Sequence, residues 1–378
     1  MTEIALLSPN GQQNTDGRGP PTCFFVATIK GVARVERSAP GAAWQVTHEA
    51  LVEKHISSLL REPRSGKLVA GSHGDGGVWI NDDGVGIAWR DASKGISNRN
   101  IYALAQRRSE SGVTLFAGAE PASIFRSKDL GESWCDLPGL RSVRDTDKWS
   151  FPPPPHIAHV KSITIHPTRP ATLFACVEQG ALLKSEDDGR TWFELTDYSR
   201  PDDPTYRDIH RIEVHPKYPD IAYLTTGVGT YRSDNGGCTW RTLTRRGSRL
   251  GYPDFSFLDP DDPEVLYVAG AEKSPSHWPG DGTANSAVLK STDGGKTWRD
   301  LRQGLPDPIR GGIEAMNRHS WPGGIMLTIA TADGEIYTSD NAGENWFLAA
   351  SGLAPISKSV HYRAFLPGAR ERGRKAYA

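Results

Sequence analysis

Ionisable and polar side chains recur in this chain at two positions, two residues apart, in seven similar segments. The first position holds Ser359, His55, Asn100, His159, Asp208, Tyr252 and Gly312. The third position holds His361, Ser57, Tyr102, Lys161, His210, Asp254 and Glu314, with Arg211 directly after His210. Side chains two residues apart lie on the same side of a β-strand, so each pair is expected to face one way.

Carboxylates and imidazoles gathered in one place can carry out acid–base catalysis. The catalytic candidates are His210, Asp254, Glu314, Tyr102, His361 and Arg211. The substrate-binding candidates are Lys161, Tyr252, Asp208, Asn100 and His73. Asp254 with Glu314 could supply acid and base for glycosidic cleavage, whereas a histidine (His210 or His361) with a tyrosine could move protons in an elimination. The residues favour a hydrolase or lyase acting on a sugar or another small polar metabolite.

Imidazoles also bind transition metals, which gives a second hypothesis for the same residues. The four ligand candidates, each from a different segment, are His55, His159, His210 and His361. With a carboxylate such as Asp254 or Glu314 they could hold one divalent ion. No compact spacing of the H-E-x-x-H kind supports this, and Lys161 would repel a cation. Acid–base chemistry without a metal therefore stays open beside it.

A repeated eight-residue motif indicates the elements that must position these side chains. SEDDGRTW at 185–192 recurs as STDGGKTW at 291–298 and SKDLGESW at 127–134, and looser copies end at four further tryptophans. The seven are Trp44, Trp89, Trp134, Trp192, Trp240, Trp298 and Trp346, and they are 45, 45, 58, 48, 58 and 48 residues apart. That spacing suits four short strands with their turns, which is the size of a propeller blade.

The segments between the motifs have the lengths and alternation of strands. In the fifth unit, DIHRIEVHP, IAYLTTG, GTYRS and CTWRTLT read as four strands from inner to outer. The first unit has only three, so KSVHYRAFLP at 358–367 is expected to supply its inner strand. We predict an all-β fold, a single seven-bladed β-propeller with four antiparallel strands per blade, closed by this C-terminal strand.

Three parts of the chain are expected. Residues 1–20 are predicted to be disordered, residues 21–367 form the propeller, and residues 368–378 form a basic tail.

The motif resembles the S-x-D-x-G-x-T-W box of the BNR/Asp-box repeat family, and the resemblance covers nearly all of residues 21–367. It implies that the box is a turn between the two outer strands and that its aspartates serve the turn. Asp-box propellers include sialidases, xyloglucanases that pair two propellers around a cleft, sortilin-type receptors and photosystem assembly factors. This chain lacks the Phe/Tyr-Arg-Ile-Pro motif of sialidases and has the length for one propeller.

Connections between the units add to the face on which the inner strands begin. Two long ones, within 141–159 and 272–286, contain Trp149 and Trp278 and could either wall a pocket or only cover a blade edge. The turn GSHGDGG at 71–77 lacks the lysine of a phosphate-binding loop, and it is expected to bring His73 near His55.

Composition limits the partners. The formal net charge of −1 gives no reason to expect nucleic acid or an anionic membrane, and no apolar run has the length of a membrane span. The N-terminus lacks a signal-peptide pattern, and four cysteines without metal spacing suit a reducing cytoplasm. The alternative to a cytoplasmic enzyme is a non-catalytic propeller scaffold that binds a protein partner through the same face.

Overall fold

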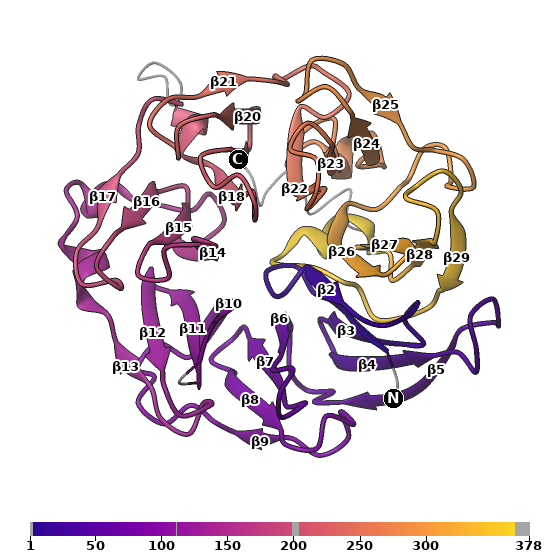
Figure 1. Cartoon of the computed structure of the whole chain (residues 1–378), viewed down its shortest axis with the longest axis horizontal. Coiled ribbons are helices and arrows are strands. Elements are labelled where there is room, and N and C mark those ends of the chain that lie inside the picture. The colour runs from indigo at the N-terminus through magenta and orange to yellow at the C-terminus, as the bar shows by residue number, and fades with distance from the viewer. Residues whose placement is uncertain (1–2, 111, 199–203, 367–378) are drawn as a thin grey trace.

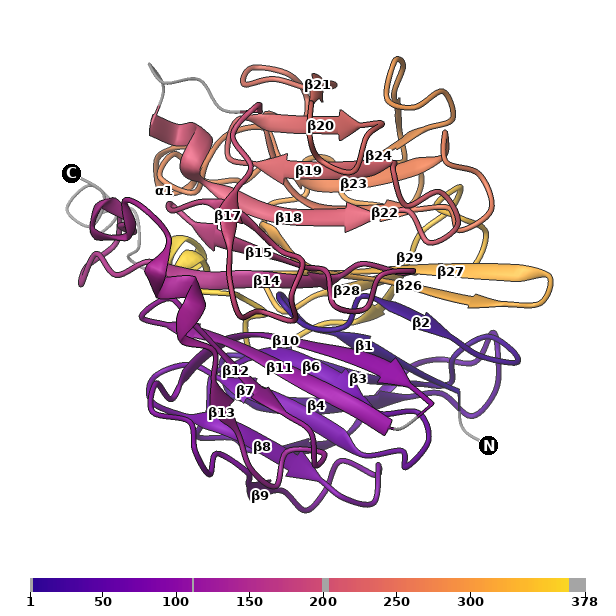
Figure 2. The same ribbon diagram turned by 60° about the vertical axis from the view of Figure 1, so that its left-hand side comes forward.

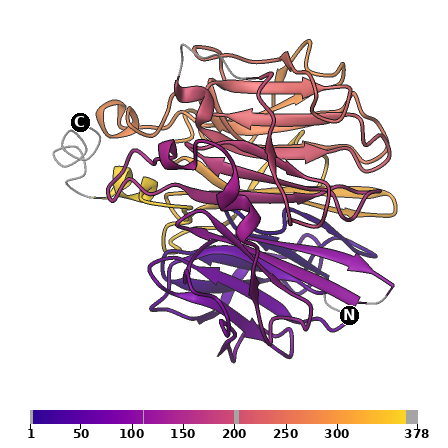
Figure 3. The same cartoon turned by 90° about the vertical axis from the view of Figure 1, so that its left-hand side faces the viewer.

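Seven small β-sheets surround a central axis, as Figure 1 shows. The computed structural model describes residues 3–110, 112–198 and 204–366. The predicted seven-bladed propeller is confirmed, and the inner three strands of blades 2 to 6 are antiparallel hairpins in chain order. Figure 3, turned by 90° from Figure 1, shows the strands from the side, and they run roughly parallel to the viewing axis of Figure 1.

Blades 2 to 6 each contain four consecutive strands. Blade 2 comprises β6 (Ile56–Arg61), β7 (Leu68–Ser72), β8 (Gly77–Asn81) and β9 (Arg90–Asp91). Blade 3 comprises β10 (Asn100–Ser109), β11 (Gly112–Glu120), β12 (Ser123–Ser127) and β13 (Cys135–Asp136). Blade 4 comprises β14 (His159–Ile165), β15 (Leu173–Glu178), β16 (Leu182–Ser185) and β17 (Phe193–Glu194). Blade 5 comprises β18 (Ile209–Val214), β19 (Ala222–Thr226), β20 (Gly229–Ser233) and β21 (Arg241–Thr242). Blade 6 comprises β22 (Tyr252–Leu258), β23 (Leu266–Ala271), β24 (Ala287–Ser291) and β25 (Arg299–Asp300).

Blade 1 is completed from the N-terminus of the chain. Strand β1 (Ile4–Leu7) pairs in parallel with β3 (Cys23–Thr28), and β4 (Gly31–Glu36) and β5 (Gln45–Ala50) follow outward. The prediction that residues 358–367 form this inner strand is wrong, because their described part contains the 3₁₀ turn η4 (His361–Phe365) and no strand. The apolar run of β1 is buried and paired with β3, so this strand takes the inner position of blade 1.

The N-terminal segment continues into the central channel, so the prediction that residues 1–20 are disordered is wrong where they are described. The backbone nitrogens of Asn10 and Gln12 donate to carbonyl groups of β6 at 3.0 and 2.8 Å. Strand β2 (Asn14–Asp16) then adds as a fifth, parallel strand to β26 of blade 7 (Figure 1). Blade 7 comprises β26 (Ile313–Trp321), β27 (Gly324–Thr331), β28 (Ile336–Ser339) and β29 (Phe347–Ala350).

The repeated motif serves the turn between the two outer strands, as its resemblance implies. In blade 4, Ser185 Oγ donates to Asp187 Oδ1 at 2.9 Å, and Asp187 accepts from the backbone and hydroxyl of Thr191 at 2.8 and 2.6 Å. The motif tryptophan packs between blades, since buried Trp134 belongs to a core formed by blades 2 and 3. These aspartates therefore have an architectural role.

Short helical turns gather on the face where the inner strands begin, which we call the upper face (Figure 2). They are η1 (Pro138–Ser142), η2 (Thr146–Lys148), η3 (Pro204–Arg207), α1 (Trp278–Asp281) and η4. The described helices are all too short to cross a membrane. The predicted basic tail, 368–378, lies outside the described residues.

Candidate functional site

In each of blades 2 to 7 a β-bulge interrupts, at the same place, the pair formed by the first two of the blade's four consecutive strands. In blade 4, for example, the register shifts between Val160 and Ser162, which leaves Lys161 as the extra residue. The six bulge residues are Ser57, Tyr102, Lys161, His210, Asp254 and Glu314. A bulge re-aims a side chain away from the ordinary strand alternation. These six are the third-position residues predicted from the sequence, and the seventh, His361, comes from η4.

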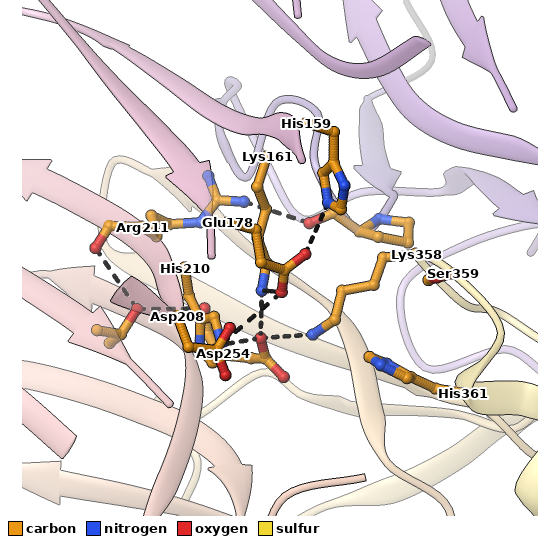
Figure 4. A network of polar contacts seen from close by, with 12 residues as sticks. His159, Lys161, Glu178, Asp208, His210, Arg211, Asp254, Lys358, Ser359 and His361 are labelled. Carbon is orange, nitrogen blue, oxygen red and sulfur yellow. Dashed lines mark hydrogen bonds and ion pairs between the residues drawn. The ribbon is translucent and has the colours of Figure 1, made fainter. Parts of the chain in front are cut away.

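Glu178, at the end of β15, lies at the centre of the resulting network (Figure 4). Its carboxylate contacts His159 Nε2 at 2.7 Å and Lys161 Nζ at 2.5 Å, and His210 Nε2 lies 3.9 Å away. Burial by itself would raise the pKa of Glu178, but Lys161 and His159 outweigh burial and hold the pKa well below its usual range. Glu178 is therefore an ionised anchor for the cations around it.

Asp254 joins the two lysines of the network. Its Oδ1 lies 3.2 Å from Lys161 Nζ and 2.5 Å from Lys358 Nζ. Burial would raise the pKa of Asp254, but Lys358 and Lys161 keep it far below the usual range. Burial likewise opposes the charge of Lys358, yet Asp254 and Glu314 raise its pKa above the ordinary value. Each ion compensates the desolvation of the other.

Glu314 ties the C-terminal segment to blade 7. It accepts from the backbone nitrogen of Lys358 at 3.2 Å, and His361 Nδ1 lies 3.2 Å away. Burial opposes ionisation of Glu314, but Lys358 and His361 lower its pKa below the ordinary value. Asp254 and Glu314 are thus ionised at neutral pH and hold cations, which makes them poor proton donors.

The network is closed off from solvent to a degree that the sequence did not indicate. The side chains of His159, His210 and Glu314 are 0% exposed. The carboxylates nearest to solvent are those of Glu120 and Asp208, whose side chains are 13% and 11% exposed. A substrate on the upper face would therefore meet these two first.

Glu120, at the end of β11, is linked to Glu178 through His159. It accepts from Asn100 Nδ2 at 2.8 Å and from the Tyr102 hydroxyl at 3.2 Å, and His159 Nδ1 lies 3.6 Å from it. Burial would lower the pKa of His159, but Glu120 and Glu178 together raise it. The imidazole of His159 is therefore poised to hold a proton between two carboxylates.

Aromatic rings extend this arrangement across blades 2, 3 and 4. The predicted proximity of His73 and His55 is confirmed, because their rings stack with centroids 4.5 Å apart. Tyr102 lies 4.0 Å from the His73 ring and stacks on His159 at 3.6 Å. Burial lowers the pKa of His73 well below the usual value and raises that of Tyr102. Both rings are therefore neutral partners of His159.

His210 places a buried ring nitrogen beside Asp208. Its Nδ1 lies 2.6 Å from the Pro253 carbonyl oxygen, which can only accept, so Nδ1 carries the proton. The other nitrogen, Nε2, is buried and has no hydrogen bond within the described chain, while Asp208 Oδ1 lies 3.3 Å from it. The partly accessible Asp208 carboxylate, held beside this imidazole, is therefore placed as a candidate general base.

The structure does not bring the four predicted metal-binding histidines together. His55 Nε2 contacts the Ser357 carbonyl at 2.8 Å, and His159 and His361 contact glutamates. Among the described residues, one other group has ligand atoms within 4.8 Å of one another, namely Glu178, Asp208 and His210. Lys161 Nζ, however, lies 2.5 Å from Glu178 and supplies the positive charge at that place. This donor set fits a proton network better than a divalent ion.

Other sequence predictions have mixed outcomes. Tyr252 lies near the network, with its ring centroid 4.8 Å from that of His210. Arg211 is drawn in the same network (Figure 4), but its guanidinium donates to the Pro9 carbonyl at 3.2 Å rather than to a carboxylate. Of the two tryptophans expected to wall a pocket, Trp149 lines a surface hollow, whereas Trp278 is 2% exposed and packs on His361.

Sequence reasoning missed Glu120, Glu178 and Lys358. The two glutamates end the second strands of their blades, in LFAGAE and LFACVE, directly opposite Asn100 and His159. An alignment of second-strand ends would have indicated them. No local pattern marks Lys358, which reaches Asp254 from a segment without strand structure.

Comparison with curated proteins finds distant relatives that act on xyloglucan. No protein-family model matches the chain. A probable oligoxyloglucan-reducing end-specific xyloglucanase of Neosartorya fischeri is 26% identical over 198 residues, which is 50% of this chain and 23% of the relative. An Emericella nidulans enzyme described as an oligoxyloglucan-reducing end-specific xyloglucanase is 25% identical over 315 residues, or 80% of this chain and 34% of the relative. The chain thus spans about a quarter to a third of these relatives.

Solved structures are similar in fold. An ancestral GH74 enzyme superposes with a TM-score of 0.59 at 18% identity, covering 78% of this chain and 37% of that chain. YCF48 bound to D1 peptide superposes with a TM-score of 0.50 at 14% identity, covering 86% of this chain and 93% of that chain. At these identities the likeness concerns the propeller fold alone.

Proposed function

We propose that this protein is a hydrolase that cleaves a glycosidic bond in a carbohydrate bound on its upper face. The observation that carries the proposal is the pairing of Asp208 with His210: the partly accessible Asp208 carboxylate lies 3.3 Å from His210 Nε2, while His210 Nδ1 is held by the Pro253 carbonyl. The xyloglucanases that the chain resembles support a carbohydrate as the substrate class.

In this proposal two carboxylates, Asp208 and Glu120, exchange protons with the reacting groups. Asp208, backed by His210, removes a proton from the attacking water. Glu120 passes the proton held by His159 to the leaving oxygen, and the raised pKa of His159 supports that role. Both side chains are near solvent and come from the two blades that flank blade 4.

Glu178 connects the two ends. After cleavage the Asp208 side holds one proton too many and the Glu120 side one too few. His159 Nε2 lies 2.7 Å from Glu178 and His210 Nε2 lies 3.9 Å from it, so this anion holds both imidazoles in place, and the two partly accessible carboxylates exchange their protons with solvent. Asp254 and Glu314 keep Lys161, Lys358 and His361 in place around it.

The experiment compares variants at the proposed base with an exposed histidine on the same face. His210→Gln and Asp208→Asn should lower kcat on neutral oligosaccharides by about 10²–10⁴-fold, the usual contribution of a general base, with the melting temperature retained. His277→Gln serves as the control, because His277 is exposed. Turnover that persists in both base variants would overturn the proposal.

A protein-binding scaffold is the second candidate, and the burial of the network favours it. His210 and Glu314 are 0% exposed, so these side chains could simply stabilise the channel. In that case no carbohydrate would be cleaved, and His210→Gln would change stability and leave partner binding unchanged.

A cytoplasmic location belongs to this proposal as well. It is supported by the four cysteines, all of which are free thiols.

A further inference from the structure

A surface hollow opens between blades 3 and 4 on the upper face. Its volume is about 330 Å³, at the small end of the range for ligand sites. Pro121 and Ala122, in the turn after β11, form one wall, and Thr146 and Trp149 of the long connection form another. The hollow has room for a sugar ring rather than for a long polymer segment.

The hollow adjoins the proposed acid side of the site. Pro121 directly follows Glu120 in the chain, so this wall and that carboxylate belong to one turn. The long connection also reaches His159, because Phe151 packs edge-on against it with ring centroids 4.8 Å apart. A sugar ring bound in the hollow would therefore be a further unit of the substrate, next to the bond that is cleaved.

Trp149 gives the hollow an aromatic wall. The ring packs over the backbone of Gly180, where a Cβ would lie 3.2 Å from Trp149 Cδ2. Its Nε1 is buried and makes no hydrogen bond within the described chain. An indole offers a flat apolar surface, and a pyranose ring offers an apolar C–H face that can stack on it.

The charges around the hollow favour an uncharged ligand. Arg141 lines it, but this guanidinium is already paired with Asp136 at 3.0 Å. His156 also lines it, and its Nδ1 lies 3.0 Å from the Phe151 carbonyl. Among the described lining residues no arginine or lysine is left to hold a sugar carboxylate, so an acidic sugar would be poorly compensated.

We propose that this hollow binds one neutral pyranose ring of the substrate, stacked on Trp149, as a subsite beside the bond to be cleaved. The subsite rests on the proposed function, since it extends the same substrate beyond Glu120.

Binding can be tested apart from cleavage by using the full chain with Asp208→Asn as the background. Calorimetric titration with cellotetraose and with a xyloglucan oligosaccharide should show binding, and sialyllactose, which carries a carboxylate, should bind more weakly. Adding Trp149→Ala should weaken binding of the neutral sugars about tenfold, as expected for loss of one stacking contact of about 1.4 kcal/mol. The matched control is Phe347→Ala, which removes an aromatic that is 62% exposed on β29.

A second variant protects the test against misfolding. Thr146→Trp fills the hollow and leaves Trp149 in place, and it should also weaken binding. The subsite is overturned if neither variant weakens binding, if Phe347→Ala weakens it equally, or if neither neutral sugar binds. If the sugars bind through Trp149 but the wild type cleaves none of them, the subsite stands and the proposed hydrolase does not.

Discussion

At the scale of single residues, His159 is the side chain whose protonation the structure determines most clearly. Glu120 and Glu178 contact its two nitrogens and outweigh burial, so its pKa is raised above the ordinary value of about 6.5. A raised histidine pKa stabilises the fold fully below the unfolded-state pKa, and this contribution is lost as pH rises through the folded-state pKa.

The first prediction follows from this dependence of stability on pH. Glu120→Gln should lower the His159 pKa, and the stability difference between wild type and variant should be larger at pH 6 than at pH 9. Nuclear magnetic resonance of the imidazole and chemical denaturation at both pH values measure these two effects. Glu53→Gln, at an exposed glutamate, is the control. A His159 titration that does not move in Glu120→Gln would contradict the contact.

The second prediction concerns metal binding and depends on the positive charge of Lys161. Its ammonium occupies the side of Glu178 that a divalent ion would need, 2.5 Å from the carboxylate oxygen. Wild-type protein purified without a tag should therefore hold substoichiometric zinc, manganese, iron or copper by elemental analysis. Lys161→Met removes the repulsion and should raise the affinity for zinc. A full equivalent of metal on the wild type would show that the lysine moves aside.

At the scale of elements, the start of β18 and the turn after β19 position the proposed base together. Gly227 donates its backbone N–H to the Asp208 carbonyl at 2.7 Å, and a Cβ at Gly227 would lie 2.2 Å from Asp208 Oδ2. The absence of a side chain at this turn is what lets the Asp208 carboxylate stay beside His210.

Gly227→Ala should therefore push this carboxylate away and reduce turnover, by less than Asp208→Asn does, at a nearly unchanged melting temperature. Gly280→Ala is the control, because a Cβ there meets nothing within 4 Å. Wild-type turnover in Gly227→Ala would mean that the position of this carboxylate does not limit the reaction.

At the scale of the whole molecule, the ring depends on which end of the chain closes it. Leu6 of β1 is 1% exposed and packs in a core with blades 1 and 2, whereas Leu366 is 41% exposed. Truncating a buried leucine to alanine costs about 2–5 kcal/mol, and an exposed substitution costs about 0.5 kcal/mol or less.

Leu6→Ala should accordingly lower the free energy of unfolding in denaturant titrations far more than Leu366→Ala. Equal losses of unfolding free energy in the two variants would indicate that the C-terminal segment contributes as much to ring closure as β1 does.

The sequence by itself determined the number of blades and the four-strand unit, and the resemblance of the motif to the Asp-box implied the role of its turn. Each of these depends on local spacing, because a turn or a strand needs only its near neighbours in the chain. The sequence alignment also picked out the six residues that the structure places at the β-bulges, Lys161 and His210 among them, although the bulge itself was not expected from strand alternation.

Only the tertiary structure decided which of these residues touch. Glu120 and Glu178 enter the site from second strands through cross-strand register, and Lys358 arrives from a segment of no regular structure. Only the tertiary structure decided which segment closes the ring, because β1 and the C-terminal segment were both long enough to complete blade 1. Distances between blades follow from ring closure, bulges and burial, and these involve residues far apart in the chain that no local pattern connects.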